Sequence, residues 1–211
     1  MKKKLFILMT IFTLAISFAG VSISITEVSA ATKKQKKITK EYKKFIKKKK
    51  YKKHIKEWNR YFGNSGMEGL SYAIADIDNN KIPELLIQAT GKLDKDWACT
   101  AIYTYDWKKK KIKRVVAGET FDGKKDYIFW SLYGITSYSP KYKAFLQQTE
   151  RGFVSYTTIK KNMAKSKHML WRDWDPVKES YTYYDKNKKI SEKKFLKYGK
   201  SLKRIKYVRI K

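Results

Sequence analysis

Apolar residues recur at steps of three and four positions through residues 33–62, which is the spacing of one buried helix face. They fall into two sets, Ile38, Tyr42, Phe45 and Ile46, followed by Tyr51, Ile55, Trp58 and Phe62. The five-residue step between the two sets breaks the helical phase at residues 47–50. The pattern predicts two short helices, or one helix kinked at this step, that end at Gly63-Asn64-Ser65-Gly66.

Beyond Gly69 the apolar residues alternate with polar ones, which is typical of strands with one buried face. Residues 70–77 and 84–90 are expected to form strands around a tight loop, and residues 98–107 and 111–117 a hairpin. Further short strands are expected at residues 126–130, 135–138, 143–149, 153–159 and 181–184. Their spacing of about ten residues predicts an antiparallel sheet or sandwich.

Near the end of the chain, Ser191 can cap the N-terminus of a helix that runs to about Ile205. Its expected buried stripe consists of Phe195, Leu196, Tyr198, Leu202 and Ile205. The fold class that follows is α+β, a mainly antiparallel β-sheet or sandwich-like domain with an N-terminal basic helical segment and a C-terminal helix. We assign residues 31–62 to the helical segment and residues 63–211 to a single β-rich domain that ends in the helix.

Residues 1–30 have the three-part layout of a secretory signal peptide. Three lysines follow Met1, an apolar run extends to Ala19, and small residues before a cut after Ala30 complete the pattern. The apolar run is shorter than the roughly 20 residues that span a bilayer, so an uncleaved anchor is the less favoured alternative. Cys99 is the only cysteine, so there is no lipoprotein cysteine and no disulfide within the chain. We therefore predict a secreted or cell-surface-associated protein, of a kind usual in Gram-positive bacteria.

The charge is strongly positive, with 50 Lys and Arg against 19 Asp and Glu. Fifteen of the basic residues lie between positions 33 and 60, where Glu41 and Glu57 are the only acids. One interpretation is that the apolar face of this segment packs on the domain while the lysines are solvated. The other is a basic amphipathic arm for an anionic cell-wall polymer or an anionic membrane surface. Export and the lack of a DNA- or RNA-reading motif argue against nucleic acid as the partner.

One loop concentrates oxygen side chains. Asp76, Asp78, Asn80 and Glu84 occupy loop positions one, three, five and nine, and the Ile82 carbonyl is at position seven. Ca²⁺ takes about six to eight oxygen ligands, and alternate residues of a tight loop can direct several of them inward. The loop lacks the glycine and the final glutamate of an EF-hand, and its flanks are strand-like. The alternative is a plain turn in which the two aspartates accept backbone hydrogen bonds.

The same residues, followed by Leu85-Leu86-Ile87, resemble the strand-loop-strand calcium motif of FG-GAP and VCBS-type repeats. The longer string ADIDNNKIPELLI, followed by AIYTYDWKKKKIKRVV, is similar to small secreted proteins of low-GC Gram-positive bacteria, which are largely uncharacterised. The resemblance implies a calcium loop and a β-rich fold but no activity. Lys81 replaces the usual glycine, and a non-glycine residue with positive φ costs about 1–2 kcal/mol. We therefore expect a weak site, with a dissociation constant on the order of 10⁻⁴–10⁻³ M.

Other candidate chemistry is sparse. With two histidines and one cysteine, His-dependent metal or triad chemistry is disfavoured, and Cys99 in an apolar strand is expected to be a buried thiol. Trp171 and Trp174 could stack on sugar rings or insert at a membrane interface, but core packing of at least one of them is the favoured interpretation. Catalytic carboxylate pairs could be drawn from the other acidic residues, although turn or surface positions are the favoured interpretation. These residues are Asp94 with Asp96, Glu119 with Asp122 and Asp126, and Asp173 with Asp175.

The sequence leaves open whether the protein is an enzyme and favours the answer that it is not. The leading hypothesis is a secreted cationic module that associates with cell-surface or other polyanions and carries a weak structural calcium site. A secreted hydrolase or cationic toxin acting on the cell wall or membrane is the alternative, and a binding or immunity-type partner protein is a third.

Overall fold

The computed structural model describes residues 32–63, 66–93, 97–120, 123–148 and 153–210. Its contacts divide the chain into two units, Met1–Thr32 and Lys33–Lys211, and every helix and strand named below belongs to the second. The predicted signal peptide, residues 1–30, lies outside the described residues. Within the described part of the chain, no helix combines the length and the apolar character needed to span a membrane.

The basic segment forms α2 (Lys33–Lys47), the 3₁₀ helix η1 (Lys50–His54) and α3 (Ile55–Phe62). The predicted break is confirmed, because Lys49 adopts a left-handed conformation with φ 50° between α2 and η1. Gly63, with φ 51°, follows the last residue of α3. A positive φ is a conformation that glycine adopts readily, which explains why the helix ends there.

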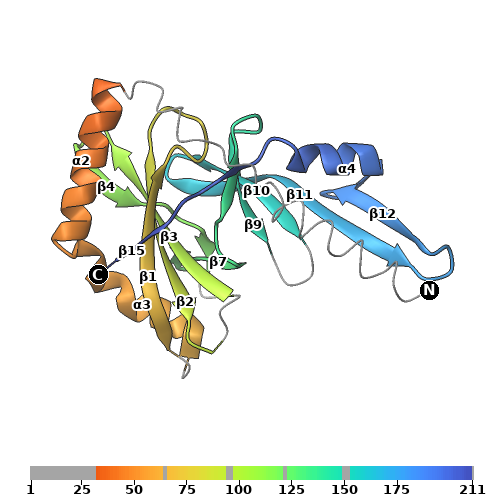
Figure 1. The fold of residues 1–211 in the computed structure, drawn as a ribbon, viewed down its shortest axis with the longest axis horizontal. Coiled ribbons are helices and arrows are strands. Elements are labelled where there is room, and N and C mark those ends of the chain that lie inside the picture. Colours follow the sequence, from red (N-terminus) through yellow and green to blue (C-terminus); the bar gives the residue numbers. More distant parts are fainter. Residues whose placement is uncertain (1–31, 64–65, 94–96, 121–122, 149–152, 211) are drawn as a thin grey trace. The chain divides into compact units, whose positions relative to one another are not determined.

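A first sheet, called sheet A, has the strand order β15-β1-β2-β3-β4, with β7 also paired to β3 (Figure 1). Its strands are β1 (Met67–Ala75), β2 (Glu84–Gly91), β3 (Trp97–Asp106), β4 (Lys111–Arg114), β7 (Phe129–Leu132) and β15 (Val208–Arg209). All of these pairings are antiparallel. Its three longest strands, β1, β2 and β3, lie close to positions where the sequence predicted strands.

A second sheet, called sheet B, has the order β13-β12-β11-β10-β9-β8-β14. Its strands are β8 (Ser137–Ser139), β9 (Ala144–Gln148), β10 (Val154–Lys160), β11 (Met163–Asp175), β12 (Ser180–Asp185), β13 (Lys188–Ile190) and β14 (Lys203–Arg204). The short strands β5 (Gly118–Glu119) and β6 (Lys125–Asp126) pair with each other. The predicted α+β class with mainly antiparallel, sandwich-like sheets is therefore confirmed.

The C-terminal helix α4 (Glu192–Gly199) begins as predicted, since the Ser191 hydroxyl accepts a hydrogen bond from Lys194 N at 3.3 Å. The predicted extent is wrong, because the helix ends at Gly199 and two short strands follow it. Leu196 is 43 % exposed, whereas Ile205 is buried from extended backbone beyond the helix. Phe195 packs on Tyr183 of β12, with ring centroids 4.9 Å apart, and Figure 1 shows α4 beside that strand.

The buried side chains form two clusters, one on each face of sheet A. The first joins alternate residues of β2 and β3, such as Leu85 and Tyr103, to apolar residues of α2, η1 and α3. The second joins the opposite face, including Leu86 and Ile102, to Phe145 of sheet B. Sheet A is therefore a middle layer between the helices and sheet B, and this explains why β2 is buried along nearly its whole length.

The first cluster also shows where the apolar face of the basic segment packs. Ile38, Tyr42 and Trp58 are fully buried, and Tyr51 and Phe62 are 3 % and 7 % exposed. These residues pack on sheet A rather than facing solvent. The interpretation that the apolar face packs on the domain is confirmed.

Candidate metal centre

The acidic loop connects β1 to β2 and is closed by hydrogen bonds within itself. Asp76 directly follows β1, and its two carboxylate oxygens each accept a 2.9 Å hydrogen bond, from Asn80 N and from Lys81 N. Asn79 and Lys81 have φ angles of 54° and 69°. Pairing of Ala75 with Glu84 joins the ends of the two strands, so the loop returns on itself within a few residues.

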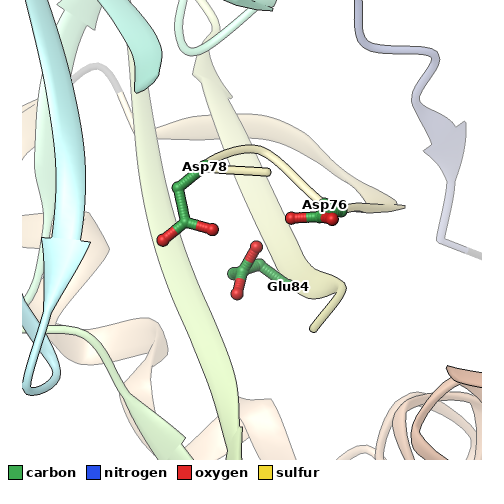
Figure 2. A group of neighbouring side chains, drawn as sticks. All are labelled: Asp76, Asp78 and Glu84. Carbon is green, nitrogen blue, oxygen red and sulfur yellow. The ribbon is translucent and has the colours of Figure 1, made fainter. Parts of the chain in front are cut away.

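This return brings three carboxylates together. Asp76, Asp78 and Glu84 each offer one oxygen, and these oxygens lie within 4.8 Å of one another. Figure 2 shows Asp78 and Glu84 directed toward each other, with Asp76 beside them. Glu84 is fully buried and Asp78 is 4 % exposed, so two of the three carboxylates are removed from water.

Few protein groups compensate these buried charges. Glu84 accepts a hydrogen bond from Ile77 N at 3.3 Å and a longer one from the Thr104 hydroxyl at 3.5 Å. The Oδ1 atom of Asp78 is buried and has no hydrogen-bond partner among the described residues. A buried carboxylate oxygen without a donor or a cation is strongly unfavourable.

The same arrangement raises the proton affinity of the site. Burial, and then repulsion from Asp78 and Asp76, raises the pKa of Glu84 well above its usual value. Burial, and then the charge of Asp76, raises the pKa of Asp78 to about 6, against the effect of hydrogen bonds from Asn80 and Ile159. Burial also raises the pKa of Asp76, although backbone N–H groups oppose it. Protons or a bound cation would relieve this repulsion.

The geometry is compatible with a cation. Two oxygens bound to the same Ca²⁺ at about 2.4 Å can be at most about 4.8 Å apart. The three carboxylate oxygens satisfy that limit. The cluster of Asp76, Asp78 and Glu84 can therefore hold a metal ion.

The other two predicted ligands are Asn80 and the carbonyl of Ile82. Asn80 is exposed, and its Oδ1 atom accepts a 2.7 Å hydrogen bond from Ile82 N. That bond closes a local turn of the kind asparagine often makes. Asn80 and the Ile82 carbonyl remain predicted ligands, and neither is part of the carboxylate cluster.

The sequence did not indicate how firmly the loop is held from outside. Tyr42 of α2 donates its hydroxyl to the carbonyl of Pro83, at 3.0 Å, and to that of Tyr103, at 3.3 Å. On the other side, Ile77 is fully buried in the cluster that includes Phe145 of sheet B. The loop therefore joins the helical layer to both sheets.

The other candidates do not form a second cluster. Among the described residues, only Asp76, Asp78 and Glu84 form a group of three or more acidic, histidine or cysteine residues with converging ligand atoms. Asp94, Asp96 and Asp122 lie outside the described residues. Cys99 is buried, as predicted, and burial raises the pKa of its thiol.

The aromatic candidates lie in β11. Trp171 is half-buried and stacks on Tyr184 with ring centroids 3.9 Å apart, and its indole N–H donates to the Lys186 carbonyl at 2.9 Å. Trp171 belongs to neither buried cluster. The side chain of Trp174 is outside the described part of the structure.

No protein-family model matches this sequence, and comparisons with curated proteins and with solved structures find no match either.

Proposed function

We propose that the chain is an exported, basic, non-enzymatic module that binds an anionic polymer of the cell surface through the lysine-rich face of α2, η1 and α3. This proposal rests on the arrangement of the side chains on these helices, with basic residues facing solvent and apolar residues facing sheet A. All fifteen Lys and Arg residues between positions 33 and 60 are exposed. The apolar residues of the same segment are buried or partly buried against sheet A.

This division produces a dense positive face on a rigid support. Glu41 and Glu57 are the only acids of the segment, and Glu57 is turned toward Arg114 in an ion pair of 2.7 Å. A surface of one charge raises the local concentration of an oppositely charged polymer and speeds its association. Such binding depends strongly on salt, because each contact releases counterions.

The packing favours a polymer over a lipid bilayer as the partner. An amphipathic helix that binds a membrane inserts its apolar face between the lipids. Here that face contains Ile38, Tyr42 and Trp58, all fully buried in the protein. The lysines can meet an anionic chain while this packing stays intact. Export rests on the signal-peptide pattern of residues 1–30, which places the partner outside the cytoplasm.

We further propose that the metal at Asp76, Asp78 and Glu84 is calcium and that its role is structural. An all-oxygen carboxylate set suits a hard cation such as Ca²⁺ better than a metal that prefers nitrogen or sulfur. The resemblance to FG-GAP-type loops supports the same assignment. Calcium would displace the protons bound at this site and neutralise the repulsion between the carboxylates. It would thereby stabilise the junction of α2 with the two sheets.

The polymer proposal is tested by retention of residues 31–211 on immobilised heparin and on immobilised wall teichoic acid. Four exposed lysines of α2, Lys36, Lys40, Lys43 and Lys47, are replaced by glutamine. The control replaces four exposed lysines on or next to α4, Lys193, Lys194, Lys197 and Lys200, so that charge loss and helix propensity match. We expect the α2 variant to elute at a clearly lower salt concentration than wild type, and the α4 variant to elute close to wild type.

Equal losses in the two variants would show that only the overall charge matters and would refute a localised face. Retention of wild type that does not change with salt would refute electrostatic binding altogether. Deleting the helical segment is not a suitable test, because it would expose the first buried cluster.

A further inference from the structure

A pocket of about 570 Å³ lies away from the metal centre and shares no residue with it. It is lined by residues of α2, η1, β3, β4, β6 and the turn between β10 and β11. The lining residues are Phe45, Lys53, His54, Tyr103, Ile112, Lys113, Arg114, Val116, Lys125, Tyr127, Lys161, Asn162 and Met163. The volume falls within the range of about 300–1,000 Å³ that small-molecule sites occupy.

The charge of this lining is of one sign. It contains four lysines and Arg114, and neither aspartate nor glutamate. Lys113 is paired with Asp106, and Arg114 with Glu57 from outside the lining. Within the described part of the chain, Lys53, Lys125 and Lys161 have no ion-pair partner. Three uncompensated cations around one concave site favour a ligand with more than one negative charge.

Two residues that line the pocket contain buried hydrogen-bond donors without a partner among the described residues. Arg114 is held by Glu57 at 2.7 Å and by His54 Nδ1 at 3.0 Å, and its guanidinium lies 4.5 Å from the Tyr127 ring centroid. Its Nε is buried without a hydrogen-bond partner among the described residues, and so is the Tyr103 hydroxyl. Burial raises the pKa of Tyr103, so the hydroxyl keeps its proton. Buried donors of this kind are normally satisfied, which points to a ligand oxygen.

The remaining lining is apolar. Phe45, Ile112, Val116 and Met163 contribute side chains, and Phe45 packs against Tyr103 with ring centroids 5.1 Å apart. Small-molecule sites usually combine such apolar surface with a few polar groups that fix orientation. A bare inorganic ion would leave this surface unused.

The β10–β11 turn is fixed at the pocket wall by Val116, which lies just beyond the end of β4. Lys161 and Asn162 both have positive φ, 52° and 63°, as in the two-residue turn that joins strands of a tight hairpin. Val116 N donates to the Asn162 carbonyl and Ala164 N donates to the Val116 carbonyl, each at 2.8 Å. These bonds keep Lys161 at the pocket, opposite the residues of η1.

We propose that this pocket binds a soluble organic phosphate. The phosphate dianion would be held by Arg114, Lys125 and Lys161 and would accept from the Tyr103 hydroxyl. An aromatic or aliphatic group of the same molecule would lie on Phe45, Ile112 and Met163. A phosphate ester supplies both the multiple charge and the several oxygen acceptors that this lining offers, and guanidinium groups match it geometrically.

This site takes one small ligand per chain. It shares Lys53 with the lysine-rich face of α2, η1 and α3, but Arg114, Lys125 and Lys161 lie outside that face. Isothermal titration calorimetry of residues 31–211 with phenyl phosphate is therefore expected to show saturable one-to-one binding. Inorganic phosphate should bind at least tenfold more weakly, because it lacks the ring, and phenol should not bind measurably. Met163→Ala should weaken phenyl phosphate and leave inorganic phosphate unchanged.

The charge variants come as a matched pair. Lys125→Gln with Lys161→Gln is expected to weaken phenyl phosphate about tenfold or more. Lys124→Gln with Lys160→Gln removes the same charge at adjacent positions outside the lining and should change binding less than twofold. Circular dichroism confirms that both variants fold.

Several results would overturn the assignment. They are the absence of saturable binding in wild type, equal effects of the two lysine pairs, or inorganic phosphate binding as tightly as phenyl phosphate. Binding to phosphatidate vesicles that phenyl phosphate does not compete would likewise show that the soluble ester is not the ligand of this pocket.

Discussion

At the residue scale, Lys81 occupies a position in the acidic loop that suits glycine. Its φ is 69°, and its backbone N–H donates to Asp76 at 2.9 Å. Replacing Lys81 with glycine should relieve about 1 kcal/mol of backbone strain, partly offset by the greater freedom of the unfolded chain. It also removes a positive charge near the carboxylates, so calcium should bind more tightly. Chemical denaturation and a calcium titration measure the two effects separately.

Lys110→Gly is the matched control for this prediction. Lys110 has a φ of 49° in the turn between β3 and β4, away from the three carboxylates. It should gain similar stability with no change in calcium binding. If both variants bind calcium as wild type does, Lys81 does not influence the site.

The raised pKa of Asp78 gives a second residue-scale prediction. Its pKa is about 6 in the folded chain, against about 4 in an unfolded one, so between these values the folded state binds more protons. The contribution of this group to stability in calcium-free protein is therefore lost as the pH rises from about 4 to 6. Calcium replaces the proton, so the rise in melting temperature caused by calcium should grow across that window.

Melting temperatures measured with calcium and with a chelator, at each pH, isolate this effect from other titrating groups. One such group is Asp106, whose pKa is lowered to about 2 by its hydrogen bonds, chiefly with Lys113, and which acts at lower pH. A calcium-dependent rise that is the same at pH 4.5 and pH 7 would contradict the proposed competition between calcium and protons.

At the element scale, α2 supports the acidic loop through one hydroxyl. Tyr42 donates to the carbonyls of Pro83 and Tyr103 from within the buried cluster. Tyr42→Phe keeps the ring but removes the donor, so we expect a loss of about 1–3 kcal/mol in the free energy of unfolding. Calcium binding should weaken as well, because Pro83 immediately precedes Glu84.

Tyr51→Phe is the control, since Tyr51 lies in the same cluster and is also buried. Equal calcium affinity in Tyr42→Phe and wild type would show that the loop does not depend on α2. Urea denaturation and calorimetry provide both measurements.

The elements that the sequence predicted well are those with a clear apolar pattern. The break between α2 and η1 follows from the step between Ile46 and Tyr51. The strands β2 and β3 are marked by nearly continuous apolar stretches, since both of their faces are buried. The strand β11 was not predicted, although it is the longest of the described strands. Its first half carries Lys165, Ser166 and Lys167, so little apolar alternation marks it. It is held by pairing with β10 and β12, its neighbours on either side in the chain, and the apolar pattern of β11 itself does not mark these pairings.

The metal centre, too, could be predicted only in part from the sequence. Asp76, Asp78 and Glu84 could be found from their spacing, because alternate residues of a tight loop point the same way. Asn80 was predicted from the same spacing and remains a predicted ligand, and its Oδ1 atom accepts a hydrogen bond from Ile82 N. The support from Tyr42 and Thr104 could not be predicted, because it joins residues that are 41 and 20 positions from their partners.

At the scale of the whole molecule, the metal centre lies where the helical layer that carries the lysines meets the layered core. The acidic loop contacts α2 through Tyr42 and the inter-sheet cluster through Ile77. A cation there would hold together the layer that presents the lysines and the sheets beneath it. In the proposed function, the lysines would determine where an anionic polymer binds, and the buried acids would determine how firmly that surface is supported.

Calcium titration of chelator-treated residues 31–211 by isothermal titration calorimetry tests this account most directly. We predict one Ca²⁺ per chain with a dissociation constant on the order of 10⁻⁴–10⁻³ M, and a higher melting temperature at saturation. Asp78→Asn should abolish both effects, whereas Asp173→Asn, at an exposed position, should retain them. The absence of binding heat together with an unchanged melting temperature in wild type, or unaltered binding in Asp78→Asn, would contradict the account.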